Sequence, residues 1–139
     1  MNFIEEMRKK AKSAPGRLVL PEGYEPRTLK AGRIIRDEGF AREVTLLGTV
    51  SQIEAEAKKQ GVDLKGLVVE EPARSAHKAE YVGAYHDLRK HKGVSLEEAE
   101  KTFMADTQHW GAMMMVKGRA DAMVSGADSE TSKVLRAAL

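Results

Sequence analysis

Four short runs of branched apolar residues, at 18–20, 44–47, 67–69 and 122–124, are separated by longer segments with mixed polarity. Runs of this kind are typical of strands buried on both faces, and the intervening segments repeat their apolar positions every three or four residues, as helices do. The alternation predicts an α/β fold in which a parallel sheet carries helices on both faces, a Rossmann-like three-layer arrangement. We find no linker, repeat or low-complexity segment, so residues 1–139 are interpreted as one domain.

Local signals place the helices between these strands. Pro26 suits the first turn of a helix that ends near Gly39. Its inward positions are predicted to be Leu29, Ala31, Ile34 and Ile35. A second helix is expected from about His77 to His91, closed by Gly93. Its apolar stripe is predicted to be Tyr81, Ala84, Tyr85 and Leu88.

Three more helices carry capping signals, in which a polar side chain precedes a glutamate by three residues. The pairs are Asn2 with Glu5, Ser51 with Glu54, and Ser95 with Glu98. The interval 70–121 between the third and fourth strands is the longest and holds three helical segments. We therefore look for functional residues in and after this crossover.

Composition excludes several classes of protein. The chain is 42% hydrophobic and 32% charged, which excludes disorder. Its net charge is +2, its basic residues are dispersed and it has no cysteine, so neither a nucleic-acid surface nor a disulfide framework is predicted. The N-terminal segment lacks the apolar core of a signal peptide, and no apolar run approaches the length of a membrane span. A cytoplasmic protein without membrane contact is expected.

The segment 125–132 follows the fourth strand and opens a helix. Ligands of open α/β sheets collect at the carboxyl ends of strands, and free N–H groups at the start of a helix suit phosphate. The candidate phosphate-binding residues are Ser125, Gly126, Ser129 and Thr131. The alternative is simple capping of the helix by Asp128 or Ser129. Neither GxGxxG nor GxxxxGK[ST] is present, which disfavours the usual dinucleotide and P-loop sites.

Two arginines are candidates for holding an anion. Arg136 lies on the face of Ser129, where a guanidinium can reach back towards a bound anion, although spacing alone favours a solvated surface side chain. Arg89 follows Tyr85 by four residues, at the border of the apolar stripe. A partly buried arginine needs a partner. That partner is either an anionic ligand or a carboxylate such as Glu98 or Glu22.

No metal site or catalytic dyad emerges from the histidines. His86 and His91 are five residues apart, which places them on different helix faces. His109 beside Trp110 is interpreted as a packed aromatic neighbour, and Met113 to Met115 as core residues under the sheet.

Several ordered segments resemble the N-terminal part of the phosphate acetyltransferases, within the phosphate acetyl/butyryltransferase family. The segments are 18–22, 27–31, 88–93, 113–118, 120–127 and 135–136. The resemblance implies the first α/β domain of that fold and an enzyme that transfers an acetyl group between coenzyme A and phosphate. Acetyl-CoA and phosphate are then the substrates, coenzyme A acts as a substrate, and no cofactor is tightly bound.

The resemblance also assigns roles to residues. Arg89 and Arg136 match two active-site arginines of the family, which are expected to hold phosphate and stabilise developing charge. We expect the Arg89 side chain to point towards the 125–132 loop. The chain departs from the family pattern at Asp128, Ser129, Glu130 and Ala137. Acidic residues at the loop disfavour a phosphate there, so a non-catalytic binding or regulatory module and a phosphate butyryltransferase remain alternatives.

The resemblance covers less than half of a family member. The family's second domain, a further arginine, the coenzyme A contacts and the aspartate proposed as base would lie beyond Leu139. The 139-residue chain alone is therefore expected to be inactive. We also expect it to form a dimer through apolar surface at Leu135, Leu139 and Met113 to Met115.

Overall fold

A computed structural model describes residues 2–138 and contains one four-stranded sheet. The strands are β1 (Gly16–Leu20), β2 (Ala41–Leu47), β3 (Val68–Glu70) and β4 (Ala122–Met123). Their order is β3-β2-β1-β4, and all pairs are parallel. The four predicted strands and the parallel sheet are thus confirmed.

Seven α-helices and two short 3-10 turns accompany the strands of the described chain. The helices are α1 (Phe3–Ser13), α2 (Pro26–Asp37), α3 (Val50–Gln60), α4 (Lys78–Arg89), α5 (Leu96–Met104), α6 (Thr107–Val116) and α7 (Thr131–Ala138). The 3-10 turns are η1 (Pro72–Arg74) and η2 (Lys90–Lys92). None of the helices within residues 2–138 has the length and apolar character needed to cross a membrane.

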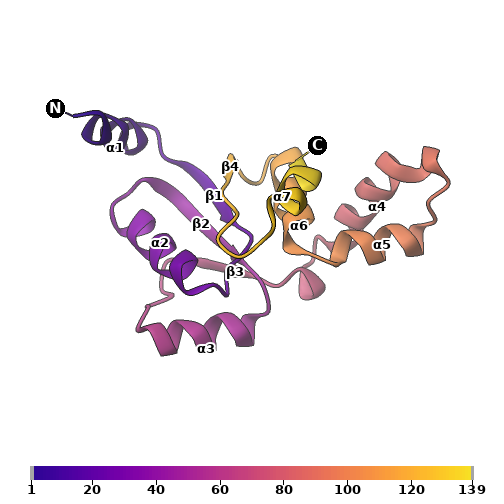
Figure 1. Ribbon diagram of the computed structural model, residues 1–139, viewed down its shortest axis with the longest axis horizontal. Coiled ribbons are helices and arrows are strands. Elements are labelled where there is room, and N and C mark those ends of the chain that lie inside the picture. The colour runs from indigo at the N-terminus through magenta and orange to yellow at the C-terminus, as the bar shows by residue number, and fades with distance from the viewer. Residues whose placement is uncertain (1, 139) are drawn as a thin grey trace.

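Figure 1 shows α2 and α3 on one face of the sheet and α4, α5 and α6 on the other, so the domain has three layers. Neighbouring strand residues face opposite layers. Val19 and Leu47 are buried among residues of α4 to α6, whereas Leu20 and Leu46 are buried against α2 and α3. A strand whose two faces are both covered is apolar at consecutive positions, which explains the uninterrupted runs seen in the sequence.

The predicted helix starts are confirmed at three places. Pro26 stands in the first turn of α2, and Asn2 forms a reciprocal capping box with Glu5 at α1. Ser95 caps α5 by accepting the N–H of Glu98 at 3.1 Å. Gly93, with φ of 76°, ends the extension of α4, as expected for a residue with no Cβ.

The predicted cap at Ser51 is wrong. Helix α3 begins at Val50, one residue earlier, so Ser51 lies inside its first turn and Thr49 precedes the helix. The Val50 N–H donates to the Glu71 carboxylate at 2.8 Å. A side chain from a distant segment therefore supplies the helix start, and local spacing does not reveal it.

The inward faces of α2 and α4 differ in part from the prediction. Leu29 is fully buried and Ile35 half-buried, but Ala31 and Ile34 are exposed. Gly32 faces the sheet instead: it is buried, and an added Cβ would lie 3.5 Å from side chains of β1 and β2, at ordinary contact distance. The helix is therefore rotated towards Gly32. On α4, Leu88 is also exposed, while its other predicted inward positions are at least partly covered.

The crossover layer has an aromatic core. Tyr81 and Trp110 have ring centroids 4.6 Å apart, and Tyr85 packs on Phe103 at 5.3 Å. The predicted core methionines are confirmed for Met113 and Met114 but not for Met115, which is 40% exposed. Leu135 is exposed as expected, and Leu139 lies outside the described residues.

Candidate functional site

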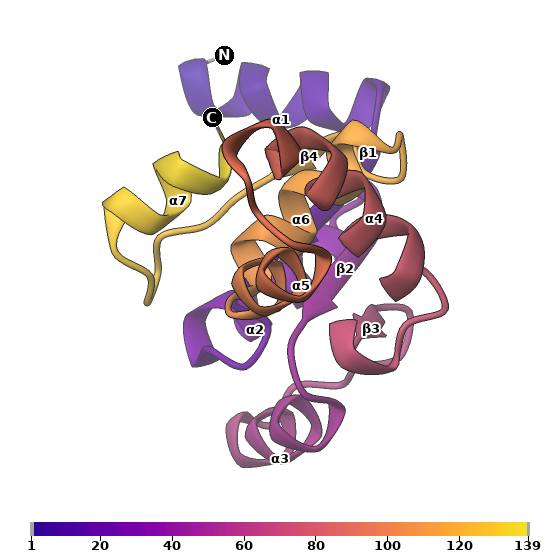
Figure 2. The same cartoon turned by 90° about the vertical axis from the view of Figure 1, so that its right-hand side faces the viewer.

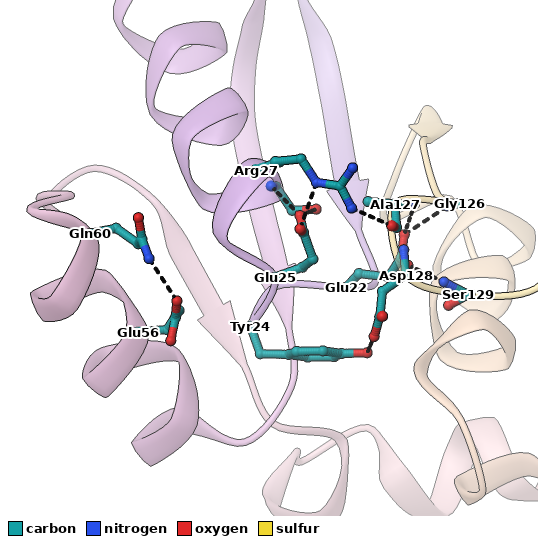
Figure 3. Close-up of polar contacts among 11 residues, drawn as sticks. Glu22, Tyr24, Glu25, Arg27, Glu56, Gln60, Gly126, Ala127, Asp128 and Ser129 are labelled. Carbon is teal, nitrogen blue, oxygen red and sulfur yellow. Dashed lines mark hydrogen bonds and ion pairs between the residues drawn. The ribbon is translucent and has the colours of Figure 1, made fainter.

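The carboxylate of Glu22 is the centre of the loop that follows β4. Glu22 comes two residues after β1, and Figure 3 shows its side chain directed at the loop. One carboxylate oxygen, Oε1, accepts hydrogen bonds from the Ser125 hydroxyl, the Gly126 N–H and the Ala127 N–H at 3.1, 2.7 and 3.0 Å. The other, Oε2, accepts the N–H groups of Asp128 and Ser129 at 2.5 and 2.7 Å. Four consecutive backbone N–H groups thus converge on one carboxylate.

These bonds keep Glu22 ionised although it is only 2% exposed. Burial by itself would raise the pKa of the carboxyl group, because a charge loses solvation inside a protein. The four backbone donors outweigh burial and lower the pKa from 4.5 to about 2. Glu22 is therefore a fixed negative charge at the carboxyl end of β1.

Two residues near the start of α2 hold the loop from the side of the sheet covered by α2 (Figure 3). The Tyr24 hydroxyl donates to the Asp128 carboxylate at 2.8 Å, and Arg27 donates to the Ala127 carbonyl at 2.6 Å. Burial, followed by the bond to Asp128, raises the pKa of Tyr24 to about 12. The hydroxyl consequently remains a donor to Asp128 at neutral pH.

Helix α6 bonds both to the end of β1 and to the loop that follows β4. The Thr107 hydroxyl donates to the Pro21 carbonyl next to Glu22, and the Gln108 amide donates to the Ser129 hydroxyl at 2.8 Å. Gln108 is buried and Ser129 is half-buried, so the bond between them is partly shielded from water. The strand end, the loop and α6 form one connected network.

The structure brings together three of the four loop residues that the sequence predicts to bind phosphate. Ser125, Gly126 and Ser129 come together as expected, but their donors converge on Glu22. Thr131 is apart from them, exposed at the first position of α7. The alternative in which Asp128 or Ser129 caps α7 is wrong, because the helix begins only at Thr131 and both side chains bond elsewhere.

The two candidate arginines line a different space, a cavity of about 300 Å³ on the α6 side of the sheet. Arg89, which is half-buried, contributes to its lining from the end of α4, and Arg136, which is exposed, contributes from α7. Other lining side chains include Tyr85, Phe103, His109 and Met113. No residue of the 125–132 loop lines the cavity within the described chain, so the structure pairs Arg89 with Arg136 and not with that loop.

The expected carboxylate partners of Arg89 are not found. Its guanidinium lies 5.6 Å from the centroid of the Tyr85 ring, a cation–π contact. Among residues 2–138 neither Arg89 nor Arg136 forms an ion pair. Glu22, one of the two proposed partners, is committed to the loop. Within the described residues, no carboxylate therefore neutralises either guanidinium.

His109 packs edge-on to Tyr85 with ring centroids 5.7 Å apart, as the interpretation of an aromatic neighbour requires. Its Nδ1 lies 3.0 Å from the Asp106 carboxylate, which also accepts the His109 N–H. Burial opposes ionisation of Asp106, but the bonds to His109 prevail and lower the pKa of the carboxyl group. His109 also lines the arginine cavity, which its position in the sequence did not indicate. No cluster of three potential metal ligands occurs in the described part of the chain.

Comparison with known proteins identifies the family of the chain. The sequence model of a family described as phosphate acetyl/butaryl transferase matches residues 2–139. The chain belongs to this family. The phosphate acetyltransferase of Treponema pallidum is 44% identical over 139 residues. That match takes in the whole of this chain and 41% of the relative.

Solved structures of phosphotransacetylases share the fold. The enzyme from Streptococcus pyogenes superposes with a TM-score of 0.90 at 29% identity, covering 100% of this chain and 42% of that one. The enzyme from Staphylococcus aureus gives a TM-score of 0.87 at 27% identity, covering 99% of this chain and 42% of that one. The chain thus spans about two fifths of these three relatives, and the expected α/β fold of the family is confirmed.

Proposed function

We propose that this chain supplies the phosphate-binding side of a phosphate acetyltransferase, which converts acetyl-CoA and phosphate into acetyl phosphate and coenzyme A. One observation carries the proposal: Arg89 and Arg136, from separate helices, line a single cavity and form no ion pair within residues 2–138. Two guanidinium groups match the charge and the donor geometry of a phosphate dianion. Membership of the family supplies the reaction.

For acetyl transfer, the cavity must hold phosphate and stabilise the negative charge that develops during the reaction. A phosphate oxygen attacks the thioester carbonyl and forms a C–O bond, and the carbonyl oxygen becomes an oxyanion. The oxyanion then re-forms the carbonyl as the C–S bond breaks, and coenzyme A leaves as a thiolate that gains the proton given up by hydrogen phosphate. Arg89 and Arg136 hold the phosphate and offset the added negative charge, which is the electrostatic part of the catalysis. The Arg89 guanidinium also makes a cation–π contact with the Tyr85 ring.

The test is a chimera in which this chain replaces the matching 41% of the Treponema pallidum phosphate acetyltransferase. We expect the chimera to exchange acetyl groups between acetyl-CoA and phosphate, and Arg89→Gln or Arg136→Gln to lower kcat/KM by about 100-fold or more. Arg8→Gln, on exposed α1, is the matched control and should leave the rate unchanged. An active chimera that is insensitive to both cavity substitutions would refute the assignment. Preference for butyryl-CoA would identify the alternative acyl chain.

The proposed reaction implies a role in acetate metabolism in the cytoplasm, where coenzyme A and phosphate are both present.

We also propose that the chain forms a dimer. Its support is exposed apolar surface at Met115, Val116 and Leu135. Light scattering of the 139-residue protein should give twice the chain mass, and a monomer over a wide concentration range would contradict the dimer.

A further inference from the structure

We infer that Glu22 is a positioning residue that occupies the anion site of the 125–129 loop from within, so that phosphate is left to the arginine cavity. The inference departs from the sequence-based assignment, which gave the loop's donors to a substrate. That Glu22 occupies the loop follows from the geometry of the loop alone. Only its consequence for catalysis rests on the proposed function.

The loop has the form of an anion site. Consecutive N–H groups that point into one concavity bind phosphate or carboxylate in many proteins. Here all four of these donors, from Gly126 to Ser129, already bond to the Glu22 carboxylate. The Asp128 carboxylate adds a second negative charge close by, held by Tyr24. A free phosphate would find no open donor and would face two carboxylates.

The same contact fixes the beginning of the segment that carries Arg136. The loop continues through Ser129 and Glu130 directly into α7. Gln108 ties Ser129 to α6, and α6 provides His109 and Met113 to the arginine cavity. Glu22 therefore sets one end of α7 relative to the wall of the cavity that Arg136 enters. Figure 2 shows the long trace from β4 to α7 that these contacts hold.

The substitution Glu22→Gln removes the negative charge of the side chain and keeps its size and shape. The single carbonyl oxygen of the glutamine can still accept from Gly126 and Ala127, as Oε1 does now. Its amide nitrogen would face the N–H groups of Asp128 and Ser129, which are donors themselves. A donor opposite a donor forms no bond and leaves buried N–H groups unsatisfied. Glu22→Gln should therefore release the second half of the loop, and Glu22→Ala all of it.

The experiment is amide NMR on the full 139-residue chain with inorganic phosphate and with formate. In the unsubstituted protein we expect phosphate to leave the amides of residues 126–129 unshifted while signals around Arg89 and Arg136 move. Glu22→Ala should lose hydrogen-exchange protection at residues 126–129, and formate should restore it with saturable amide shifts. Glu71→Gln, which removes a carboxylate that accepts one N–H at α3, is the matched control and should not change the loop. Saturable phosphate shifts at residues 126–129 in the unsubstituted protein, or a protected loop in Glu22→Ala, would overturn the inference.

Activity of the chimera separates this inference from the proposed function. There Glu22→Gln should raise the KM for phosphate about tenfold and change the KM for acetyl-CoA less than about twofold, because only the Arg136 side is displaced. An unchanged KM for phosphate would remove the catalytic part of the inference. A chimera that is inactive with Glu22 in place would refute the proposed function, whereas the NMR result on the chain alone would still decide whether Glu22 holds the loop.

Discussion

Protonation of Glu22 should destabilise the fold in acid, and the structure gives the size and the pH range of the effect. The pKa of the carboxyl group is about 2 in the folded protein, compared with an ordinary value of 4.5. A carboxyl group whose pKa is lowered by folding stabilises the protein fully above its unfolded pKa. This stabilisation is lost as the pH falls from about 4.5 through about 2.

The magnitude follows from the two pKa values. Linkage predicts that the Glu22 contribution to the free energy of unfolding falls by about 1.4 kcal/mol between pH 7 and 3.5, and by about 3 kcal/mol at pH 2. Urea unfolding at a series of pH values measures it, with the fluorescence of Trp110, the single and buried tryptophan, as the signal. Glu22→Gln cannot titrate. Its stability should be lower at pH 7 and should decline less in acid by these amounts.

Other carboxyl groups titrate in the same range, among them Asp121, whose bonds to Arg17 lower its pKa to about 2. They are present in both proteins, so the difference between the two pH profiles isolates Glu22. Parallel profiles, with the same loss of stability in acid, would refute the conclusion that the loop stabilises a charged carboxylate.

Three further substitutions test the packing. Trp110→Ala should lower the free energy of unfolding by about 3–5 kcal/mol in urea titrations followed by circular dichroism, and a loss below about 1 kcal/mol would mean that the aromatic layer is loosely packed. Gly23→Ala should cost about 1–3 kcal/mol, because the new Cβ would meet the Leu47 carbonyl oxygen at 2.7 Å, and unchanged thermal melting would contradict this contact. Asn2→Ala should reduce helical ellipticity but change stability by less than about 0.5 kcal/mol, since α1 buries no residue; a larger change would show that α1 packs on the domain.

The strands could be read from the sequence because their signal is local. A strand covered on both faces has apolar residues at consecutive positions, and β2 shows this at Val44, Leu46 and Leu47. Helix starts could be predicted where the cap lies within three residues, as at Asn2 and Ser95. The start of α3 could not, because its partner Glu71 lies 21 residues away.

In the candidate site, too, local features could be predicted from the sequence and contacts between distant residues could not. Local spacing places Arg89 at the border of the apolar stripe of α4, where it lines the cavity, but leaves its partner open between an anionic ligand and a carboxylate and does not indicate the contact with the Tyr85 ring. The sequence predicts that the loop offers its N–H groups to phosphate, whereas in the structure those of residues 126–129 bond to Glu22. This partner of the loop was missed, although Glu22 directly follows Leu20 and Pro21 at the end of β1 and parallel strands bring such ends to one edge. A charged residue at that position is a signal for this contact.

The distance along the chain between Glu22 and its partners has a consequence for folding order. The bonds join residues 103 to 107 positions apart, whereas the pairing of β1 with β2 begins with Gly16 opposite Ala41. The loop can close on Glu22 only after the whole crossover has packed and β4 has joined β1 through its two paired residues. We therefore expect the segment from β4 to α7 to be the last part of the domain to fold and the first to open. The arginine cavity, which needs Arg136 from this segment, would then exist only in the fully folded protein.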